Sequence, residues 1–252
     1  MTLQRIAAWL DRELRHETFE DDSHNGLQVA NAGRVTRVAC GVDASMAFFR
    51  EARSRGCDFL VCHHGLSWGN SLARITGLNY SRVGYLIRNG MALYASHLPL
   101  DAHPRLGNNI GIARALGLRN LRPFGVYRGR KIGFAGSLPK AMSIDDFLVL
   151  ARRAIAAKRL NTMLFGPRKV RTVGVVSGGA AMEIREAGED GLDVYLSGEP
   201  NLAAWSMAEE LGVNGVFAGH YATEVFGVRA LGRALSSRFR LPVEFIDLGV
   251  SY

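Results

Sequence analysis

Cysteine is scarce in this sequence, and the few residues present do not form a metal-binding pattern. The chain of 252 residues has three cysteines, Cys40, Cys57 and Cys62, with no CxxC pair among them. All three lie in or beside apolar, strand-like runs. Since thiolate zinc sites need closely spaced cysteine pairs, we exclude such a site and expect buried, reduced thiols.

Long apolar runs are also absent. No stretch reaches the roughly 18 uncharged apolar residues of a membrane-spanning helix, although 48% of the residues are apolar. The segment from Met1 to Arg15 alternates charged and apolar residues, unlike a secretory signal peptide. We therefore expect a soluble, globular, cytoplasmic protein.

Acidic residues are fewer than basic residues, and the formal net charge is +8. The excess arginine is spread along the chain and is dense only in the segments 128–131 and 168–171. Polyanions such as nucleic acids bind basic surfaces by releasing counterions, but no nucleic-acid-binding module and no interleaved aromatics accompany these segments. The pattern favours a solvated, arginine-rich surface over a nucleic-acid footprint.

Short runs of Val, Ile, Phe and Ala alternate with stretches of helical period, which is typical of strands joined by crossover helices. The sequence thus predicts an α/β fold. In the first half we expect strands at 35–42, 58–62 and 91–96, and helices at 45–55, 80–88 and 107–116. In the second half we expect a helix from a capping box at Ser143 to about Ala157, and strands at 172–177, 193–197, 215–218 and 243–248.

Glycine and proline accumulate between Gly117 and Lys140, around one expected strand at 131–137. This composition indicates a join between two lobes. We predict a first lobe at 1–125, completed by 225–252, a second lobe at 126–224, and a site in the cleft between them.

Histidine and carboxylate residues follow three of the expected strands. The strand 58–62 runs into His63 and His64, the strand 91–96 into His97 and Asp101, and the strand 215–218 into His220 and Glu224. In open α/β sheets ligands bind outside the carboxyl ends of strands. These three turns therefore predict one polar site.

The residue types at these turns indicate a metal site. Adjacent histidines at a strand end point to opposite sides, so His63 and His64 suit two different ions. On a helix, His220 and Glu224 share one face, and Glu224 could bridge the ions, with Asp101 as a further ligand. Such a nitrogen and oxygen set serves zinc, iron, manganese or nickel.

Other polar residues receive lesser roles. We expect His97 and His103 to orient ligands or bind an anion, with a structural role equally open for His103. Glu199 is a candidate general base, and His16 and His24 are expected at the surface.

Several glycine motifs have a structural and a ligand-binding interpretation. Asn25-Gly26 predicts a tight turn, and Gly107-Asn108-Asn109 a helix cap or an anion site. The turns at 177–180 and 197–200 could hold phosphate through backbone N–H groups.

Five motifs together extend over nearly the whole chain: Asn25-Gly26-Leu27-Gln28-Val29, Val61-Cys62-His63-His64-Gly65-Leu66, Ser96-His97-Leu98-Pro99-Leu100-Asp101, Gly107-Asn108-Asn109 and Gly219-His220-Tyr221-Ala222-Thr223-Glu224. In this order they resemble the Nif-three-like family, whose YbgI-like bacterial members carry the label GTP cyclohydrolase 1 type 2 homologue. Leu98 departs from the threonine of many members, and the inserted domain of longer members is absent.

The resemblance implies a dinuclear centre in a Nif-three-like fold of two interlinked α/β lobes, with mixed sheets flanked by helices. In it, His64 and Asp101 hold one ion, His63 and His220 hold the other, and Glu224 contacts both. It also implies a toroidal homo-hexamer.

Three functions are compatible with such a site. The first is a metal-dependent hydrolase in which a metal-bridging water attacks a nucleotide-like substrate, with Glu224, His97 and Glu199 as catalytic groups and, by the family label, GTP as the substrate. The second is a non-catalytic metal-handling or regulatory hexamer. The third is a ring-shaped nucleic-acid-binding protein.

Overall fold

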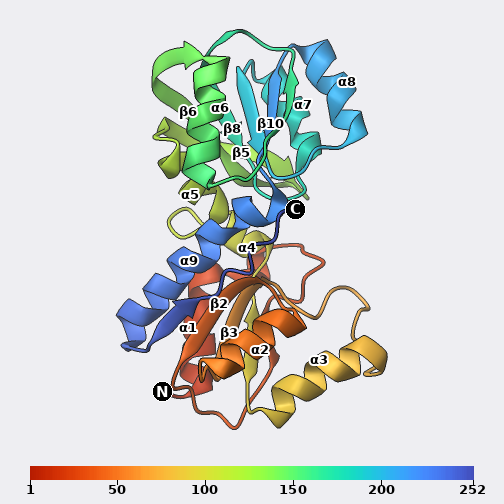
Figure 1. Cartoon of the computed structure of the whole chain (residues 1–252), viewed down its shortest axis with the longest axis vertical. Coiled ribbons are helices and arrows are strands. Elements are labelled where there is room, and N and C mark those ends of the chain that lie inside the picture. The colour runs from red at the N-terminus through yellow and green to blue at the C-terminus, as the bar shows by residue number, and fades with distance from the viewer. The chain divides into compact units, whose positions relative to one another are not determined.

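The computed structural model describes all residues from 1 to 252 and divides them into two compact units (Figure 1). Unit 1 comprises Met1–Leu100 and Gly227–Gly249, and unit 2 comprises Asp101–Phe226 and Val250–Tyr252. Each unit contains a mixed sheet flanked by helices, as the α/β pattern predicts.

Unit 1 is built on a five-stranded sheet of order β1-β4-β3-β2-β11. The edge strand β1 is antiparallel to β4, and the other pairs are parallel. Its strands are β1 (Gly26–Val29), β2 (Val38–Asp43), β3 (Phe59–His64), β4 (Ala92–Ala95) and β11 (Val243–Phe245). Its helices are α1 (Leu3–Leu14), η1 (His16–Thr18), α2 (Met46–Ser54) and α3 (Gly77–Arg88), and α4 (Leu98–Asp101) ends at the first residue of unit 2.

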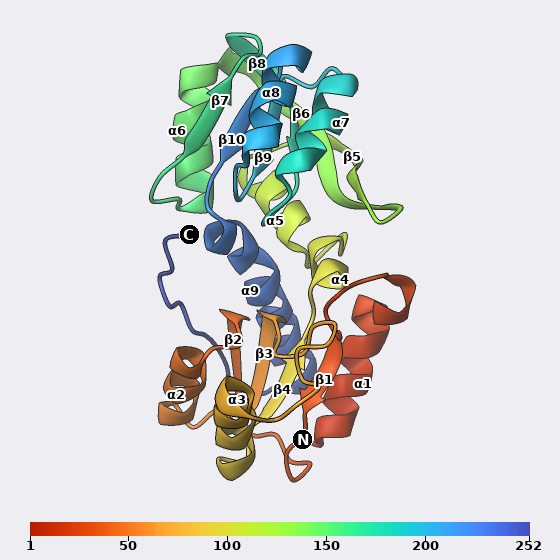
Figure 2. The ribbon, with the colours of Figure 1, turned by 90° about the vertical axis from the view of Figure 1, so that its right-hand side faces the viewer.

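Helices cover both faces of this sheet. Figure 2 shows α1 on one side and α2 with α3 on the other. Helix α9 (His220–Phe239) begins in unit 2 and continues into unit 1, where Trp9 of α1 packs edge-to-face on Phe239 with ring centroids 5.6 Å apart. Gly232 lets α9 approach the sheet, because a Cβ there would lie 3.0 Å from Cys40 Sγ.

Unit 2 contains a six-stranded sheet of order β5-β6-β8-β9-β10-β7. The pairs β8/β9 and β9/β10 are parallel, and the remaining pairs are antiparallel. Its strands are β5 (Arg119–Tyr127), β6 (Arg130–Ser143), β7 (Asn161–Leu164), β8 (Lys169–Val175), β9 (Val194–Ser197) and β10 (Asn214–Phe217). Its remaining helices are α5 (Asn108–Ala115), α6 (Ile144–Ile155), η2 (Ala181–Glu183), α7 (Ile184–Glu189) and α8 (Leu202–Leu211).

The core of unit 2 lies on the α5 and α6 face of its sheet. Buried residues of α6 such as Ile144 and Phe147 belong to one cluster with Val173 and Leu196 of the central strands. On the opposite face α7 and α8 pack together (Figure 2), where Gly188 leaves room for Leu211.

Two local predictions are wrong. The segment expected as a glycine-rich join is a long hairpin of β5 and β6, since Arg128 and Gly129 both take the left-handed conformation of a two-residue hairpin turn. The expected tight turn at Asn25-Gly26 instead opens β1, with Gly26 opposite Ala95. None of the helices is both long and apolar enough to cross a membrane.

Candidate metal centre

Three histidines meet at the carboxyl ends of β3 and β4 in unit 1. His63 and His64 are the last residues of β3, and His97 follows β4 by two residues. One ligand atom from each lies within 4.8 Å of the others. Successive residues of a strand usually point to opposite faces, but the ring centroids of His63 and His64 are only 4.7 Å apart. The Nδ1 atom of His63 faces Ser96, which follows β4, and that of His64 faces Asp43 of β2.

Each of these rings is oriented through its Nδ1 atom. The Nδ1 of His63 lies 2.9 Å from the carbonyl oxygen of Ser96, which can only accept a hydrogen bond. The Nδ1 atoms of His64 and His97 each lie 2.8 Å from a carboxylate oxygen, of Asp43 and Asp21 respectively. A neutral ring that donates from Nδ1 presents the lone pair of Nε2, which is the form that binds a metal.

Asp21, the partner of His97, is a buried carboxylate that accepts four hydrogen bonds. Its side chain is 3% exposed and accepts hydrogen bonds from His97 Nδ1, Asn25 Nδ2 and the backbone N–H groups of Ser23 and Leu98. Burial alone would raise the pKa of Asp21, but the bonds and charge of His97, with those from Asn25 and Ser23, hold the pKa at about 2. Asp21 is therefore an ionised anchor for His97.

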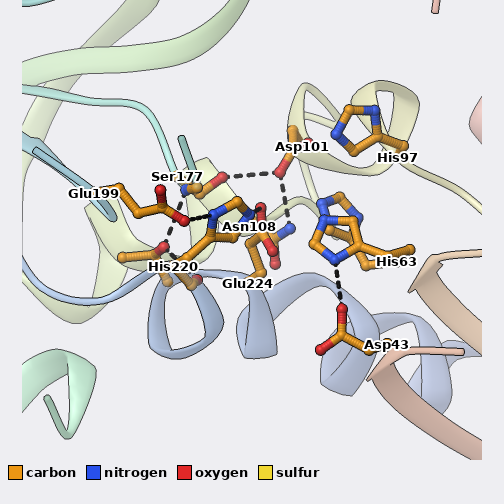
Figure 3. Close-up of polar contacts among 12 residues, drawn as sticks. Asp43, His63, His97, Asp101, Asn108, Ser177, Glu199, His220 and Glu224 are labelled. Atoms are coloured by element: carbon orange, nitrogen blue, oxygen red, sulfur yellow. Dashed lines mark hydrogen bonds and ion pairs between the residues drawn. The ribbon is translucent and has the colours of Figure 1, made fainter. Parts of the chain in front are cut away.

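Unit 2 carries a second ligand group at the start of α9. His220 Nε2 lies 3.0 Å from Glu224 Oε1, one helical turn away, and Glu224 is 2% exposed. His220 Nδ1 donates to Glu199, which follows β9 (Figure 3). The fourth histidine is thus oriented in the same way as the three of unit 1.

Two carboxylates also set the protonation of His220. Burial alone would lower the pKa of His220, but the hydrogen bonds and charges of Glu224 and Glu199 outweigh it and raise the pKa to about 9. In the absence of a metal the ring is therefore an imidazolium at neutral pH.

Asp101 of unit 2 is buried and fixed by two donors. Its Oδ1 accepts from Asn108 Nδ2 and from Ser177 Oγ, both at 2.8 Å (Figure 3). The neighbouring Asn109 accepts from the backbone N–H of Ser177. Gly107 is the N-cap of α5, which is one of the two predicted roles of the motif, and Asn108 and Asn109 also position the aspartate and the loop after β8.

Gly178 lies directly beneath the His220 and Glu224 side chains. A Cβ at this position would lie 2.4 Å from Glu224 Oε1 and 3.2 Å from His220 Nε2, and the residue has φ of +68°. The backbone N–H of Gly178 donates to Thr223 Oγ1 at 3.0 Å. The turn after β8 therefore holds α9 in place and leaves room for the Glu224 carboxylate.

Replacing Gly178 by alanine is expected to displace Glu224 as well as strain the backbone. The matched control is Gly191→Ala, because Gly191 has φ of +65° and a methyl group added there would have no neighbour within 4 Å. The control should lose about 1 to 2 kcal/mol of unfolding free energy, and Gly178→Ala about 1 to 3 kcal/mol more from overpacking. Denaturant unfolding of both variants measures the difference; equal losses would contradict the contact.

The comparisons with known proteins agree on one family. The family model of Duf34/NIF3 (NGG1p interacting factor 3) matches residues 1–249. The chain belongs to this family. A Deinococcus radiodurans relative named "GTP cyclohydrolase 1 type 2 homolog" is 43% identical over 242 residues, covering 96% of this chain and 91% of the relative.

Other members of the Duf34/NIF3 family support the same assignment. An Archaeoglobus fulgidus relative of the same name is 39% identical over 250 residues, covering 98% of each chain. A solved structure described as "protein ybgI, unknown function" superposes with a TM-score of 0.93 at 31% identity and covers all of both chains. The predicted family and fold are confirmed.

The donor set of this Duf34/NIF3 chain fits divalent transition metals. His63, His64 and His97 form a group that could hold an ion, and Asp101, His220 and Glu224 also belong to such groups. Imidazole nitrogens with a few carboxylate oxygens are the ligands of zinc, manganese, iron and nickel sites. The buried thiols lie outside these groups.

The lesser predictions have mixed outcomes. His103 accepts from the backbone N–H groups of Arg105 and Leu106, which is a structural role. His24 is exposed as expected, whereas the surface placement of His16 is wrong: its side chain is 12% exposed and contacts Ser96 Oγ at 3.2 Å. Asp21 and Asp43 were not predicted, although Asp43 ends β2 and Asp21 precedes β1, and Ser177 was predicted only as part of a glycine turn that could hold phosphate.

Proposed function

We propose that this protein is a metal-dependent hydrolase with two divalent ions held by His63, His64, Asp101, His220 and Glu224. Chain connectivity supports this set of residues, because Asp101 ends α4 only four residues after His97. Similarly, α9 carries His220 and Glu224 in unit 2 and continues into unit 1.

The observation that carries the proposal is the shared orientation of four histidines. In His63, His64, His97 and His220, Nδ1 faces a carbonyl or carboxylate oxygen. A single histidine held in this way is common, but four histidines whose Nδ1 atoms all face an acceptor are typical of a metal site. The acceptors are supplied by four different segments of the chain.

The chemistry then divides between the ions and the side chains. Bound ions would supply Lewis acidity and lower the pKa of a water. Glu224 is the group we assign to proton acceptance, since it is buried and lies beside His220. Glu199 orients His220, so we assign it a positioning role and not that of a free general base.

The name shared by the relatives suggests GTP as the substrate, although a shared family does not fix a substrate. Purified protein loaded with Zn²⁺ or Mn²⁺ is expected to release formate from GTP by hydrolysis of the purine ring. His63→Ala should abolish this release, because His63 is fully buried and its Nε2 would be lost as a ligand.

The matched control for that assay is His24→Ala, which removes an exposed histidine that lies outside the ligand groups. Its turnover should equal that of the unsubstituted protein, and thermal unfolding should show both variants folded. If the unsubstituted protein releases formate no faster than His63→Ala does, GTP is excluded as the substrate.

A second candidate function is metal handling. The side chains of His64, His97 and His220 are 20%, 23% and 27% exposed, so solvent can reach the ligands and ions can exchange. Incubation of the loaded protein with a metal-free acceptor enzyme distinguishes the two functions. A carrier gives up its ions to the acceptor, whereas a hydrolase retains them through turnover.

A further inference from the structure

We propose that the hairpin of β5 and β6 in unit 2 binds double-stranded DNA by placing its turn in the major groove. The contact residues are the six of the hairpin tip, 126–131, all of which are exposed. None of them belongs to the ligand groups of the candidate metal centre. The proposal therefore adds a binding activity that does not depend on the proposed hydrolysis.

The positive charge of the protein is concentrated in the segment that contains this hairpin. Residues 102–144 include eight Lys and Arg residues and no Asp or Glu. The whole chain has 31 Lys and Arg and 23 Asp and Glu, so the rest of the chain contains 23 residues of each sign. The net charge of +8 thus belongs entirely to α5, β5, β6 and their connections, contrary to the spread expected from the sequence.

The tip of the hairpin extends beyond the sheet. Strand β6 pairs with β8 only from Phe134 onward. Nearer the turn, Val126 and Tyr127 of β5 pair with Lys131 and Arg130 of β6, and these residues have no third strand beside them. Figure 2 shows the turn extending away from the other strands of unit 2. The tip is therefore an exposed two-stranded ribbon.

The base of this ribbon is fixed, which gives the tip a defined direction. Phe124 and Ile132 are buried, and the carbonyl oxygen of Ile132 accepts a hydrogen bond from Asn109 Nδ2 at 2.8 Å. The Glu186 carboxylate of α7 accepts from the backbone N–H of Val126 at 2.7 Å. A binding element that is ordered before it meets its partner loses less conformational entropy on binding.

Two carboxylates outside the hairpin bond to β5. Glu186 accepts from its backbone, and Asp190 Oδ2 accepts from Arg122 NH2 at 2.7 Å. Both carboxylates are thus engaged on the sheet side of the turn. Since the hairpin itself contains no acidic residue, the cations at 128, 130 and 131 give its tip a positive field.

The side chains of the tip match a nucleic-acid surface. Arg and Lys side chains bind phosphates and release the counterions of DNA. Between the cations stand two exposed apolar side chains, Val126 at 48% and Tyr127 at 38% exposure. The guanidinium carbon of Arg128 lies 5.5 Å from the centroid of the Tyr127 ring. Cations interleaved with an aromatic side chain supply both phosphate contacts and a surface that packs on bases.

The shape of the tip selects the class of nucleic acid. The strands of a ribbon are about 4.8 Å apart, and a two-stranded ribbon with its side chains fits the major groove of B-DNA, which is about 12 Å wide. The major groove of an RNA duplex is too deep and narrow for side chains to read. Single strands are bound in basic grooves and not by extended ribbons. Duplex DNA is therefore the partner that fits.

The test measures the binding of a fluorescein-labelled DNA duplex to the full chain by fluorescence anisotropy. The protein should bind at about 50 mM salt, and its affinity should fall roughly 40-fold or more at about 200 mM if each tip cation contacts a phosphate. Replacing the three cations together should weaken binding about tenfold or more at the lower salt, and should make the logarithmic salt slope about 2.7 less steep. This variant is Arg128→Gln, Arg130→Gln, Lys131→Gln.

A matched control removes three cations from the other dense basic segment of unit 2. The control variant is Arg168→Gln, Lys169→Gln, Arg171→Gln, and all three side chains are exposed. It has the same net charge as the tip variant but should keep the affinity of the unsubstituted protein. In a further variant, Tyr127→Ser should weaken binding about tenfold with an unchanged salt slope, because it removes a packing surface and no charge.

Thermal unfolding should show every variant folded, since all the substituted side chains are exposed. The proposal is overturned if no DNA duplex binds at the lower salt, or if the two triple variants lose affinity equally, because binding then follows net charge alone. It is also overturned if an RNA duplex or single-stranded DNA binds as tightly as duplex DNA. GTP turnover enters none of these measurements, so failure of the hydrolysis assay leaves the proposal standing.

Discussion

Replacing Glu224 by glutamine is expected to remove one of the two metal ions that we propose and to abolish the proposed hydrolysis. Glutamine has nearly the same shape, so the 2% exposed site stays filled. It carries no negative charge and is a far weaker metal ligand than a carboxylate. We expect the affinity of the weaker ion to fall roughly 100-fold, which corresponds to about 2.7 kcal/mol.

Metal titration with calorimetry checks this prediction. The control is Glu209→Gln on α8, an exposed glutamate in the same unit. The control should bind both ions with unchanged affinity, and thermal unfolding should show that both variants are folded without metal. Two ions bound normally by Glu224→Gln would show that this carboxylate is not a ligand.

The affinity for metal is expected to rise about tenfold per pH unit between pH 7 and about pH 9. A metal binds the neutral ring of His220, but in the metal-free protein burial is outweighed by Glu224 and Glu199, and the pKa is raised to about 9. Each binding event below that pH must displace a proton. Above it the ring is already neutral, so the dependence should level off.

The raised pKa of His220 also affects the stability of the metal-free protein. A raised pKa stabilises the folded state, fully at a pH below the ordinary histidine value of 6.5, and this contribution is lost as the pH rises through 9.

Dialysis at pH 6, 7, 8 and 9 measures the metal affinity. Glu199→Gln is the variant in which the pH dependence of this affinity should shift to lower pH. A pH-independent affinity in the unsubstituted protein would contradict the role of His220.

Local signals predicted much of the fold. Ser143 accepts from the backbone N–H of Asp146 at 3.1 Å and starts α6, as its capping box predicts. Gly56 ends the first predicted helix with φ of +72°. The strand-end positions of His63, His97 and His220 were also predictable, because a buried strand and the polar turn after it are contiguous in the sequence.

The partners of these residues were not predictable from the sequence. Asp43 meets His64 because it is its register partner in the pairing of β2 with β3. Asp21 and His97 are separated by 76 residues, and so are Asp101 and Ser177. Such pairs depend on which strands become neighbours in a sheet, and no local pattern specifies that.

The hairpin of β5 and β6 was missed for a related reason. Its glycines and Pro123 suggest a loop when read alone, yet pairing with β8 gives the strand β6 its partners. Gly133 is required there because a Cβ would lie 2.2 Å from Val175 O. Glycine in this segment therefore reflects close backbone approach and not an irregular join.

The most direct test of the central claim is the metal content of the purified protein. Chain purified without chelator, dialysed against trace Zn²⁺ and analysed by plasma mass spectrometry should contain close to two divalent ions. Their loss on treatment with chelator should be reversible. Less than one ion per chain, after loading at pH 8 to 9, would contradict the metal centre.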